Sequence, residues 1–183
     1  MGLEIERRFL VVGEEWRAFA GPAVPLRQGY LAGSPQGFTV RMRIMAMEQA
    51  WLTLKAPAEG IARHEFEYRI PLVDAEALWG LAPDRLIKTR YELSLEGGDW
   101  VVDCFEGANA PLVLAEVELV SAEDRLEIPA WCWQEVTGAS EWNNAALTRT
   151  PIQQWTDQRR RDYGLAGPTR PKGLYNLITV PIE

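Results

Sequence analysis

The chain contains one histidine, two cysteines and no long apolar segment, and each of these scarcities excludes a class of function. Cys104 and Cys132 lie far apart in the sequence and fit no metal-ligand spacing, so we expect two reduced thiols. His64 alone cannot supply the ligands of a zinc site. No segment approaches the roughly 18 apolar residues of a membrane-spanning helix, and the N-terminal segment is charged where a signal peptide would be apolar. These features predict a cytoplasmic protein with no membrane partner.

Basic residues are also too scarce for a surface that binds nucleic acid. The 19 Lys and Arg residues are outnumbered by 26 Asp and Glu residues, which gives a formal charge of −7 and a pI near 4.9. Because the phosphate backbone calls for a basic surface, we expect no nucleic-acid partner, and any smaller polyanion must bind at a local basic site. The chain also lacks a Walker loop, a dinucleotide-binding glycine turn and a nucleophilic serine or cysteine arrangement.

What the chain does have is alternation of polar and apolar residues, which is typical of β-strands with one apolar face. Val40, Met42 and Ile44, for example, alternate with one threonine and two arginines. The alternation predicts eight strands, at residues 3–12, 24–32, 38–47, 51–56, 63–70, 86–95, 100–107 and 112–120. Eight antiparallel strands suggest that the sheet closes into a barrel.

Helical spacing is confined to short segments, at residues 14–20, 72–81, 121–128 and 140–155. A chain of 183 residues with 47% hydrophobic residues is long enough for one domain with its own core. We therefore expect an α+β domain over residues 1–156. It should be an eight-stranded antiparallel closed β-barrel, or tunnel, with a few helices packed outside and a C-terminal helix. Residues 157–183 are rich in Arg, Gly and Pro and are expected to form a loosely held tail.

Like charges recur two residues apart on five of the predicted strands. Residues i and i+2 of a strand point to the same face, roughly 6.5 Å apart, so each pair directs two like charges to one place. The signs are sorted into acidic and basic pairs, namely Glu4/Glu6, Glu65/Glu67 and Glu116/Glu118, and Arg41/Arg43 and Lys88/Arg90. If this face is exposed, the protein is a structural barrel with a solvated exterior. If it is buried, ions of opposite charge must lie between the pairs, and the sorting of the signs favours such a charge-lined tunnel.

This mixture of charges suits a site for a metal ion and a polyphosphate. Guanidinium and ammonium groups bind phosphate oxygens, and carboxylates without His or Cys hold hard divalent cations such as Mg²⁺ or Mn²⁺. One ion can orient the phosphate chain while a second activates water for attack on phosphorus. Arg8, Lys55 and Asp103 occupy strand positions that are compatible with the same face.

Several segments resemble a known family. EIERRFLV at residues 4–11 resembles the Glu-x-Glu-x-Lys signature of the CYTH, or triphosphate tunnel metalloenzyme, superfamily. The likeness covers residues 3–150 and continues through VPLRQGYL, VRMR, LTLKA, RHEFEYRI, IKTRY, VDCFEG and LAEVEL. It implies an eight-stranded antiparallel tunnel and is strongest to short bacterial members that hydrolyse inorganic tripolyphosphate. Other members are thiamine triphosphatases, class IV adenylate cyclases and RNA triphosphatases, all of which act on triphosphates with a divalent metal.

The resemblance also implies roles for individual residues. The metal ligands it implies are Glu4, Glu6, Glu116 and Glu118, joined by Asp103. The residues it implies for phosphate binding are Arg8, Arg41, Arg43, Lys55, Lys88 and Arg90. For catalysis it implies Lys55 or Lys88, which would stabilise the leaving phosphate or orient the attacking water, and Glu65 and Glu67, which would hold a second metal or its water. Tyr30 matches a tunnel tyrosine that tunes turnover, with a packed strand aromatic as the alternative.

The chain departs from the family pattern in two places. Arg8 stands where lysine is usual, which keeps the charge but changes the contact geometry. Near the C-terminus, where relatives have a Tyr-Lys-Asn-Lys-like helix, the chain reads Trp142-Asn143-Asn144-Ala145, so a basic phosphate contact is missing. Arg149 follows one helical turn later and is the candidate to replace that contact.

Together these features predict a metal-dependent tripolyphosphatase that forms phosphate and pyrophosphate with Mg²⁺ or Mn²⁺, two ions being bound with the substrate. One alternative is a hydrolase or cyclase that acts on an organic triphosphate such as thiamine triphosphate or ATP, although no pocket for a base or a thiazole can be assigned. Another is a polyphosphate-binding module without catalysis. We expect a small-molecule polyphosphate as the substrate and a monomer or homodimer as the state of assembly.

Overall fold

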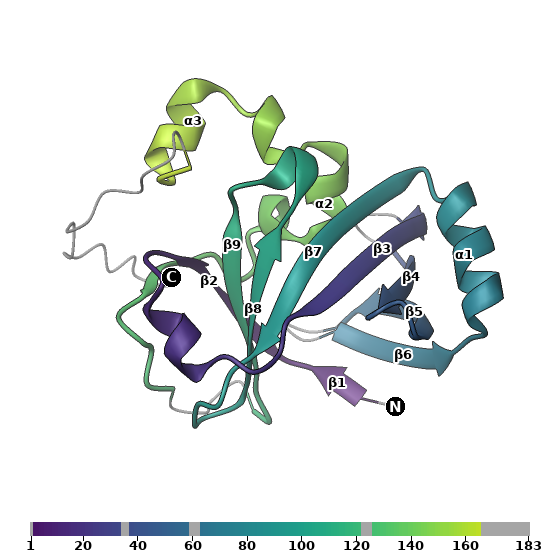
Figure 1. Ribbon diagram of the computed structural model, residues 1–183, viewed down its shortest axis with the longest axis horizontal. Helices are drawn as coiled ribbons and strands as arrows, with labels where there is room; N and C mark the ends of the chain where they lie inside the picture. Colours follow the sequence, from purple (N-terminus) through teal and green to yellow (C-terminus); the bar gives the residue numbers. More distant parts are fainter. Residues whose placement is uncertain (1, 34–36, 59–62, 122–125, 166–183) are drawn as a thin grey trace.

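The computed structural model describes residues 2–33, 37–58, 63–121 and 126–165, without the side chains of residues 2–4 and 63 (Figure 1). One antiparallel sheet dominates it, with the strand order β1-β6-β5-β4-β3-β7-β8-β9-β2-β10. The strands are β1 (Gly2–Glu4), β2 (Glu6–Val11), β3 (Val24–Gly33), β4 (Thr39–Met45), β5 (Gln49–Pro57), β6 (Arg63–Arg69), β7 (Asp84–Glu92), β8 (Asp99–Phe105), β9 (Val113–Glu118) and β10 (Cys132–Glu135). The helices are α1 (Leu72–Leu81), α2 (Asn144–Arg149) and α3 (Asp157–Asp162), and short 3₁₀ turns are η1 (Glu15–Phe19), η2 (Gly107–Asn109), η3 (Ser140–Trp142) and η4 (Ile152–Gln154). No helix in these segments is long and apolar enough to span a membrane.

The barrel is closed where the covalent chain passes through Ile5 from β1 to β2, and not by a continuous ladder of hydrogen bonds between strands. All eight expected strands are present, but the first is divided at Ile5 into β1 and β2. β1 pairs with β6 and β2 pairs with β9, so this divided strand joins the two sides of the sheet. The expectation of a closed eight-stranded barrel is therefore wrong in two respects. The ladder is interrupted where the chain changes partners at Ile5, and a short additional strand, β10, pairs with β2.

The apolar faces of the strands point outward and are covered. On one side, Met42 and Ile44 of β4 pack under Ala75 of α1 in one core cluster. On the other side, Phe9 and Trp100 pack with residues that include those of η1 and of the segment before β10. Burial of both outer faces leaves the charged faces to point into the barrel. The structure thus decides the question that the alternation left open, and the alternative of a structural barrel with a charged exterior is wrong.

Inward-facing positions change from charged to apolar toward one end of the barrel. On β2, Leu10 follows Arg8 at the next inward position, and on β9 the inward position before Glu116 is Leu114. Leu10 and Leu114 are almost fully buried and belong to one core cluster with Trp142 and Leu147. We call residues 140–165 the plug, because side chains of this segment fill the apolar end of the barrel.

The helical segment expected over residues 140–155, with a kink or stop at Pro151, consists of several short helical pieces in the structure. α2 ends at Arg149, two residues before Pro151, and the segment divides into η3, α2 and η4. Three rings hold these short pieces together: the ring centroid of Trp142 lies 4.9 Å from that of Trp155 and 4.8 Å from that of Tyr163. Such rings pack favourably beyond the area that they bury.

The packed domain also extends beyond the boundary expected at residue 156. Residues 157–162 form α3, and the side chain of Thr156 caps this helix by accepting a hydrogen bond from the amide of Arg159. Leu165 is buried in the same core cluster as Trp142. The rest of the expected tail, residues 166–183, lies outside the described part of the chain, as do residues 122–125 of the helical segment expected at 121–128.

The plug is expected to be a major source of stability. Trp142→Ala should lower the free energy of unfolding by about 3–5 kcal/mol, because it removes a large, fully buried ring and leaves a cavity. Denaturant titration measures this difference. The control is Trp133→Ala, which removes a ring that is 38% exposed and should cost well under half as much. Equal losses in the two variants would show that the plug does not stabilise the barrel.

Candidate active site

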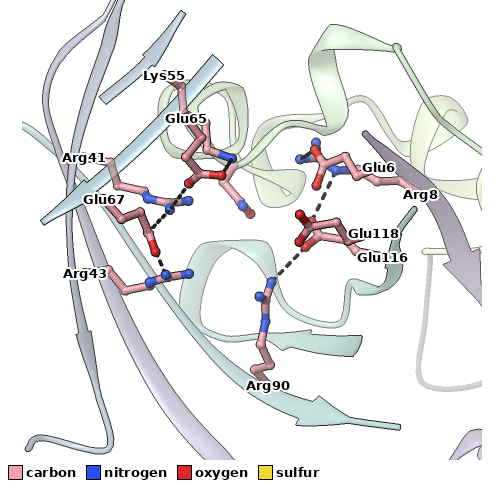
Figure 2. Close-up of a pocket in the computed structure, with 11 residues that line it drawn as sticks. Glu6, Arg8, Arg41, Arg43, Lys55, Glu65, Glu67, Arg90, Glu116 and Glu118 are labelled. Carbon is pink, nitrogen blue, oxygen red and sulfur yellow. Dashed lines mark hydrogen bonds and ion pairs between the residues drawn. The ribbon is translucent and has the colours of Figure 1, made fainter. Parts of the chain in front are cut away.

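The barrel encloses a cavity of about 230 Å³ (Figure 2). Its lining residues are Glu6, Arg8, Arg41, Arg43, Lys55, Glu65, Glu67, Arg90, Glu116, Glu118 and Asn144. Five of these side chains are acidic and five are basic, so their formal charges cancel, and Asn144 is the one neutral member. Among the described residues, the lining contains neither an aromatic nor an aliphatic side chain. The described part of the lining therefore offers both charges to a ligand and no apolar side chain.

On one wall, neighbouring strands β4, β5 and β6 place their charges side by side. Arg41, Thr53 and Glu67 lie opposite one another in the register of these strands. The carboxylate of Glu67 accepts a hydrogen bond from Thr53 Oγ1 at 2.8 Å and one from Arg43 Nη2, also at 2.8 Å. Arg41 Nη2 donates to Thr53 Oγ1 at 3.2 Å and lies 3.4 Å from Glu67 Oε1. Burial and the neighbouring charge of Arg41 lower the pKa of Arg43 to about 10, so the guanidinium stays charged at neutral pH.

Glu65 and Lys55 extend this wall. Lys55 Nζ lies 3.4 Å from Glu65 Oε2, and Arg41 Nη2 lies 3.5 Å from Glu65 Oε1. Figure 2 shows the side chains of Lys55, Glu65, Arg41, Glu67 and Arg43 following one another along this side of the cavity. Each carboxylate of the wall thus faces basic groups on the next strands.

The opposite wall centres on Glu116. Its Oε1 lies 3.2 Å from Arg8 Nε, and its Oε2 accepts a hydrogen bond from Arg90 Nη2 at 2.8 Å. Arg8 also forms an ion pair with Glu6 on the same strand. Burial alone would raise the pKa of Glu116, but the positive charges of Lys88, Arg8 and Arg90 hold it well below its usual range. Glu116 is therefore ionised at neutral pH.

Lys88 and Asp103 lie behind this wall and do not line the cavity. Both side chains are fully buried, and Lys88 Nζ lies 2.5 Å from Asp103 Oδ2. Asp103 also accepts two hydrogen bonds from Arg90, at 2.7 and 2.8 Å. Burial lowers the pKa of Lys88 to about 8, against the opposing effect of Asp103. In this structure Asp103 holds Arg90 in place and pairs with Lys88, and the contacts with metal and phosphate that the resemblance implies for Asp103 and Lys88 stay predictions.

Tyr30 also lies behind the lining. It is buried on β3 opposite Arg41 of β4. Burial raises the pKa of its phenol to about 12, so the group stays protonated at neutral pH and can donate a hydrogen bond but cannot act as a base. The charges of Arg41, Arg8 and Glu116, which line the cavity, also act on this phenol, so the tunnel tyrosine and the packed strand aromatic both stay predictions.

The carboxylates on the β2/β9 wall have the chemistry of a site for a hard divalent cation. Glu6 lies opposite Glu118 in the strand register, and Glu116 is two residues from Glu118 on the same strand. All of the donors are carboxylate oxygens, the ligands that Mg²⁺ and Mn²⁺ prefer. As the side chains lie, no three acidic, His or Cys groups of the described residues are grouped closely enough to hold an ion, and Glu116 is engaged by arginines. The side chain of Glu4 is outside the described part of the structure.

Three polar residues near the cavity were not predicted as site residues. Thr53 shares the inward face of β5 with Lys55, so the alternation carried a signal for it. Asn144 lay in the motif that departs from the family pattern, and nothing in that motif showed that it faces the cavity. Gln28 is fully buried on β3 between Arg43 and Leu86, and its amide has no hydrogen-bond partner within the described segments.

Arg149 does not supply the basic contact that was missing from the motif. Its Nε lies 3.1 Å from Asp84 Oδ2, and the side chain is 45% exposed. Neither Arg149 nor Ala145 is among the lining residues. The plug therefore presents a neutral amide to the cavity and no cation.

Comparison with known proteins gives matches over most of the chain. An inorganic triphosphatase of Acetivibrio thermocellus is 37% identical over 159 residues, which cover 86% of this chain and 100% of that protein. An inorganic triphosphatase of Nitrosomonas europaea is 39% identical over 153 residues, 79% of this chain and 95% of that protein. A crystal structure of an inorganic triphosphatase superposes with a TM-score of 0.59 at 35% identity, covering 81% of this chain and 95% of the other. Residues 2–143 match the CYTH domain, and the chain therefore belongs to the CYTH domain family.

Proposed function

We propose that the protein hydrolyses inorganic tripolyphosphate to phosphate and pyrophosphate in the charge-lined cavity, with Mg²⁺ or Mn²⁺ as cofactor. The observation that carries this proposal is the pairing of five basic and five acidic side chains around one enclosed space. The similarity to two inorganic triphosphatases over nearly their whole length supports the same reaction.

The basic side chains would bind the phosphate chain. Arg41, Arg43 and Lys55 lie along one wall and Arg90 and Arg8 on the other, so a polyphosphate between them meets donors on both sides. Guanidinium groups can contact two phosphate oxygens at once, whereas the ammonium of Lys55 is a compact charge. Because each of these basic side chains faces a carboxylate in the structure without substrate, substrate binding would exchange the internal ion pairs for contacts with phosphate.

The acidic side chains would hold the cations. Glu6, Glu116 and Glu118 would supply oxygen ligands on one wall, and Glu65 and Glu67 would supply them on the other, which suits two ions. The resemblance implies Glu4 as a further ligand. Bound there, the ions would neutralise phosphate charge and lower the pKa of water for attack on phosphorus. Asp103 would act through Arg90, since it is buried behind the wall.

The cavity favours an inorganic substrate over an organic triphosphate. Its volume of about 230 Å³ is below the roughly 300–1,000 Å³ of pockets that enclose drug-sized ligands. In the part of the lining that the structure describes, no aromatic or aliphatic side chain is available on which a base or a thiazole ring could stack. The intact carboxylates distinguish the site from a polyphosphate-binding module, which needs only the basic groups.

Phosphate release is the direct test of the proposal. We expect release from tripolyphosphate with Mg²⁺ or Mn²⁺, much less from ATP, thiamine triphosphate or pyrophosphate, and none with a chelator. Glu116→Gln should abolish release, because it removes a charged ligand oxygen, while Glu48→Gln changes an exposed carboxylate outside the cavity and should have no effect. The proposal fails if no metal-dependent release is seen from tripolyphosphate.

The two implied lysines should behave differently. Lys55→Met removes a cation that lines the cavity and should raise the KM for tripolyphosphate with little change in the free energy of unfolding. Lys88→Met leaves Asp103 buried with fewer partners and should lower the free energy of unfolding by about 3–5 kcal/mol. Steady-state kinetics and denaturant titration of both variants separate these effects. Equal stability of the Lys88 variant and the unmodified protein would contradict a supporting role for the buried pair.

A further inference from the structure

Arg8 contacts two of the three carboxylates that the described part of the β2/β9 wall offers to a metal ion. Its Nη2 forms an ion pair with Glu6 Oε1 on the same strand, and its Nε lies 3.2 Å from Glu116 Oε1 on β9. The three side chains are between 10% and 20% exposed, and partly buried ion pairs are screened only weakly. A guanidinium group thus engages oxygens that a divalent cation would need.

The main chain holds Arg8 in this place. Its N–H donates to Thr137 Oγ1 at 3.0 Å, and its carbonyl oxygen accepts from the amide of Val136 at 2.8 Å. Both groups point away from β9, so Arg8 and Glu116 form a non-hydrogen-bonded pair of the antiparallel ladder, the kind in which the side chains lie closer together. Rotation of the side chain, and not movement of the strand, is therefore the way in which the guanidinium can leave Glu116.

Both carboxylate oxygens of Glu116 are engaged in this arrangement. Oε2 accepts a hydrogen bond from Arg90 Nη2 at 2.8 Å, while Oε1 faces Arg8. A metal ion would have to displace Arg8 to reach Oε1, and the guanidinium would lose its partner in a partly buried site, which is costly. A polyphosphate lowers that cost, because its oxygens accept hydrogen bonds from the displaced guanidinium.

We propose that Arg8 controls entry of the metal: its guanidinium occupies the metal-binding carboxylates until a polyphosphate arrives and binds it instead. The inference rests on the proposed function, because it takes Glu6 and Glu116 as metal ligands. The apparent affinity for a cation alone is lowered in proportion to the fraction of molecules in which Arg8 has turned away. The metal therefore binds tightly only together with the phosphate chain.

Binding of Mn²⁺ alone to the full chain tests this role without any turnover. The loss of the free-ion signal in electron paramagnetic resonance measures it. Arg8→Met removes the guanidinium, keeps a long side chain, and should tighten the Kd for Mn²⁺ by about tenfold or more. Adding Glu116→Gln to this variant should abolish the gain, which locates it at the β2/β9 wall. Arg8→Met should at the same time weaken the Kd for tripolyphosphate in a chelator, measured by calorimetry, because a phosphate contact is lost.

Two further variants serve as controls. Arg7 is the preceding residue of β2, and its guanidinium pairs with Glu135 and lies outside the cavity lining, so Arg7→Met should leave both dissociation constants unchanged. Arg8→Lys restores the residue that is usual in the family. It should bind Mn²⁺ more tightly than the unmodified protein but less tightly than Arg8→Met, because an ammonium group keeps the charge without the planar fork.

Other outcomes would overturn the assignment. Unchanged Mn²⁺ affinity in Arg8→Met, with weaker binding of tripolyphosphate, would mean that Arg8 only binds phosphate. Weaker binding of both ligands would mean that the residue is structural, and an equal gain in Arg7→Met would mean that any lost positive charge has the same effect. If Arg8→Met does not fold, Arg8→Gln carries the same expectations. A protein that shows the two opposite shifts in affinity but releases no phosphate would refute the proposed hydrolysis and not the role of Arg8.

Discussion

Mutual neutralisation of charges inside the barrel is the interaction on which the rest of the structure depends. Ten ionic side chains face one enclosed space, and charged groups tolerate such burial only when they are paired. Because the inward faces of the strands carry these charges, the apolar outer faces must be covered from outside, and α1 and the aromatic residues packed on the other side cover them. The plug completes the arrangement by filling the end of the barrel where the inward positions become apolar.

The same pairing prepares the cavity for a ligand that carries both signs of charge. A polyphosphate alone would leave the carboxylates facing an anion, and a cation alone would leave the guanidinium groups facing a cation. When metal and phosphate bind together, Glu116 can exchange its two arginine partners for the metal ion. Arg8 and Arg90 can then exchange Glu116 for phosphate, so that no buried charge is left unpaired. Binding of the two should therefore be coupled, each raising the affinity for the other. Lys88 and Asp103 keep their pairing behind the wall during this exchange and hold Arg90 in position.

Much of the fold could be predicted from local patterns. Alternation of polar and apolar residues placed all eight expected strands, and the helix expected at 72–81 has those bounds in the structure. What depended on tertiary packing could not be predicted. The four residues of β10 are too short a segment for alternation to reveal, and no residue type signals the change of strand partners at Ile5.

The position of an inward-facing side chain along the barrel axis could not be predicted from the sequence either. Lys88 and Arg90 form one of the paired charges, yet only Arg90 reaches the cavity, because Lys88 lies closer to the apolar end filled by the plug. Spacing along a strand shows which face a side chain occupies and does not show how far along the barrel it lies. Asn144 could not be predicted as a lining residue for a related reason: its motif differs from the family pattern in charge, and a neutral amide carries no signal of the direction in which it faces.

The most direct test of the central claim is a crystal structure with Mn²⁺ and imidotriphosphate, in which NH groups replace the bridging oxygens of the substrate. Anomalous scattering locates the manganese. The predicted result is a manganese peak beside Glu6, Glu116 and Glu118, with phosphoryl groups against Arg41, Arg43 and Lys55 and the internal ion pairs broken. Manganese and phosphate bound only outside the cavity, with those ion pairs intact, would contradict the claim that the paired charges form the binding site.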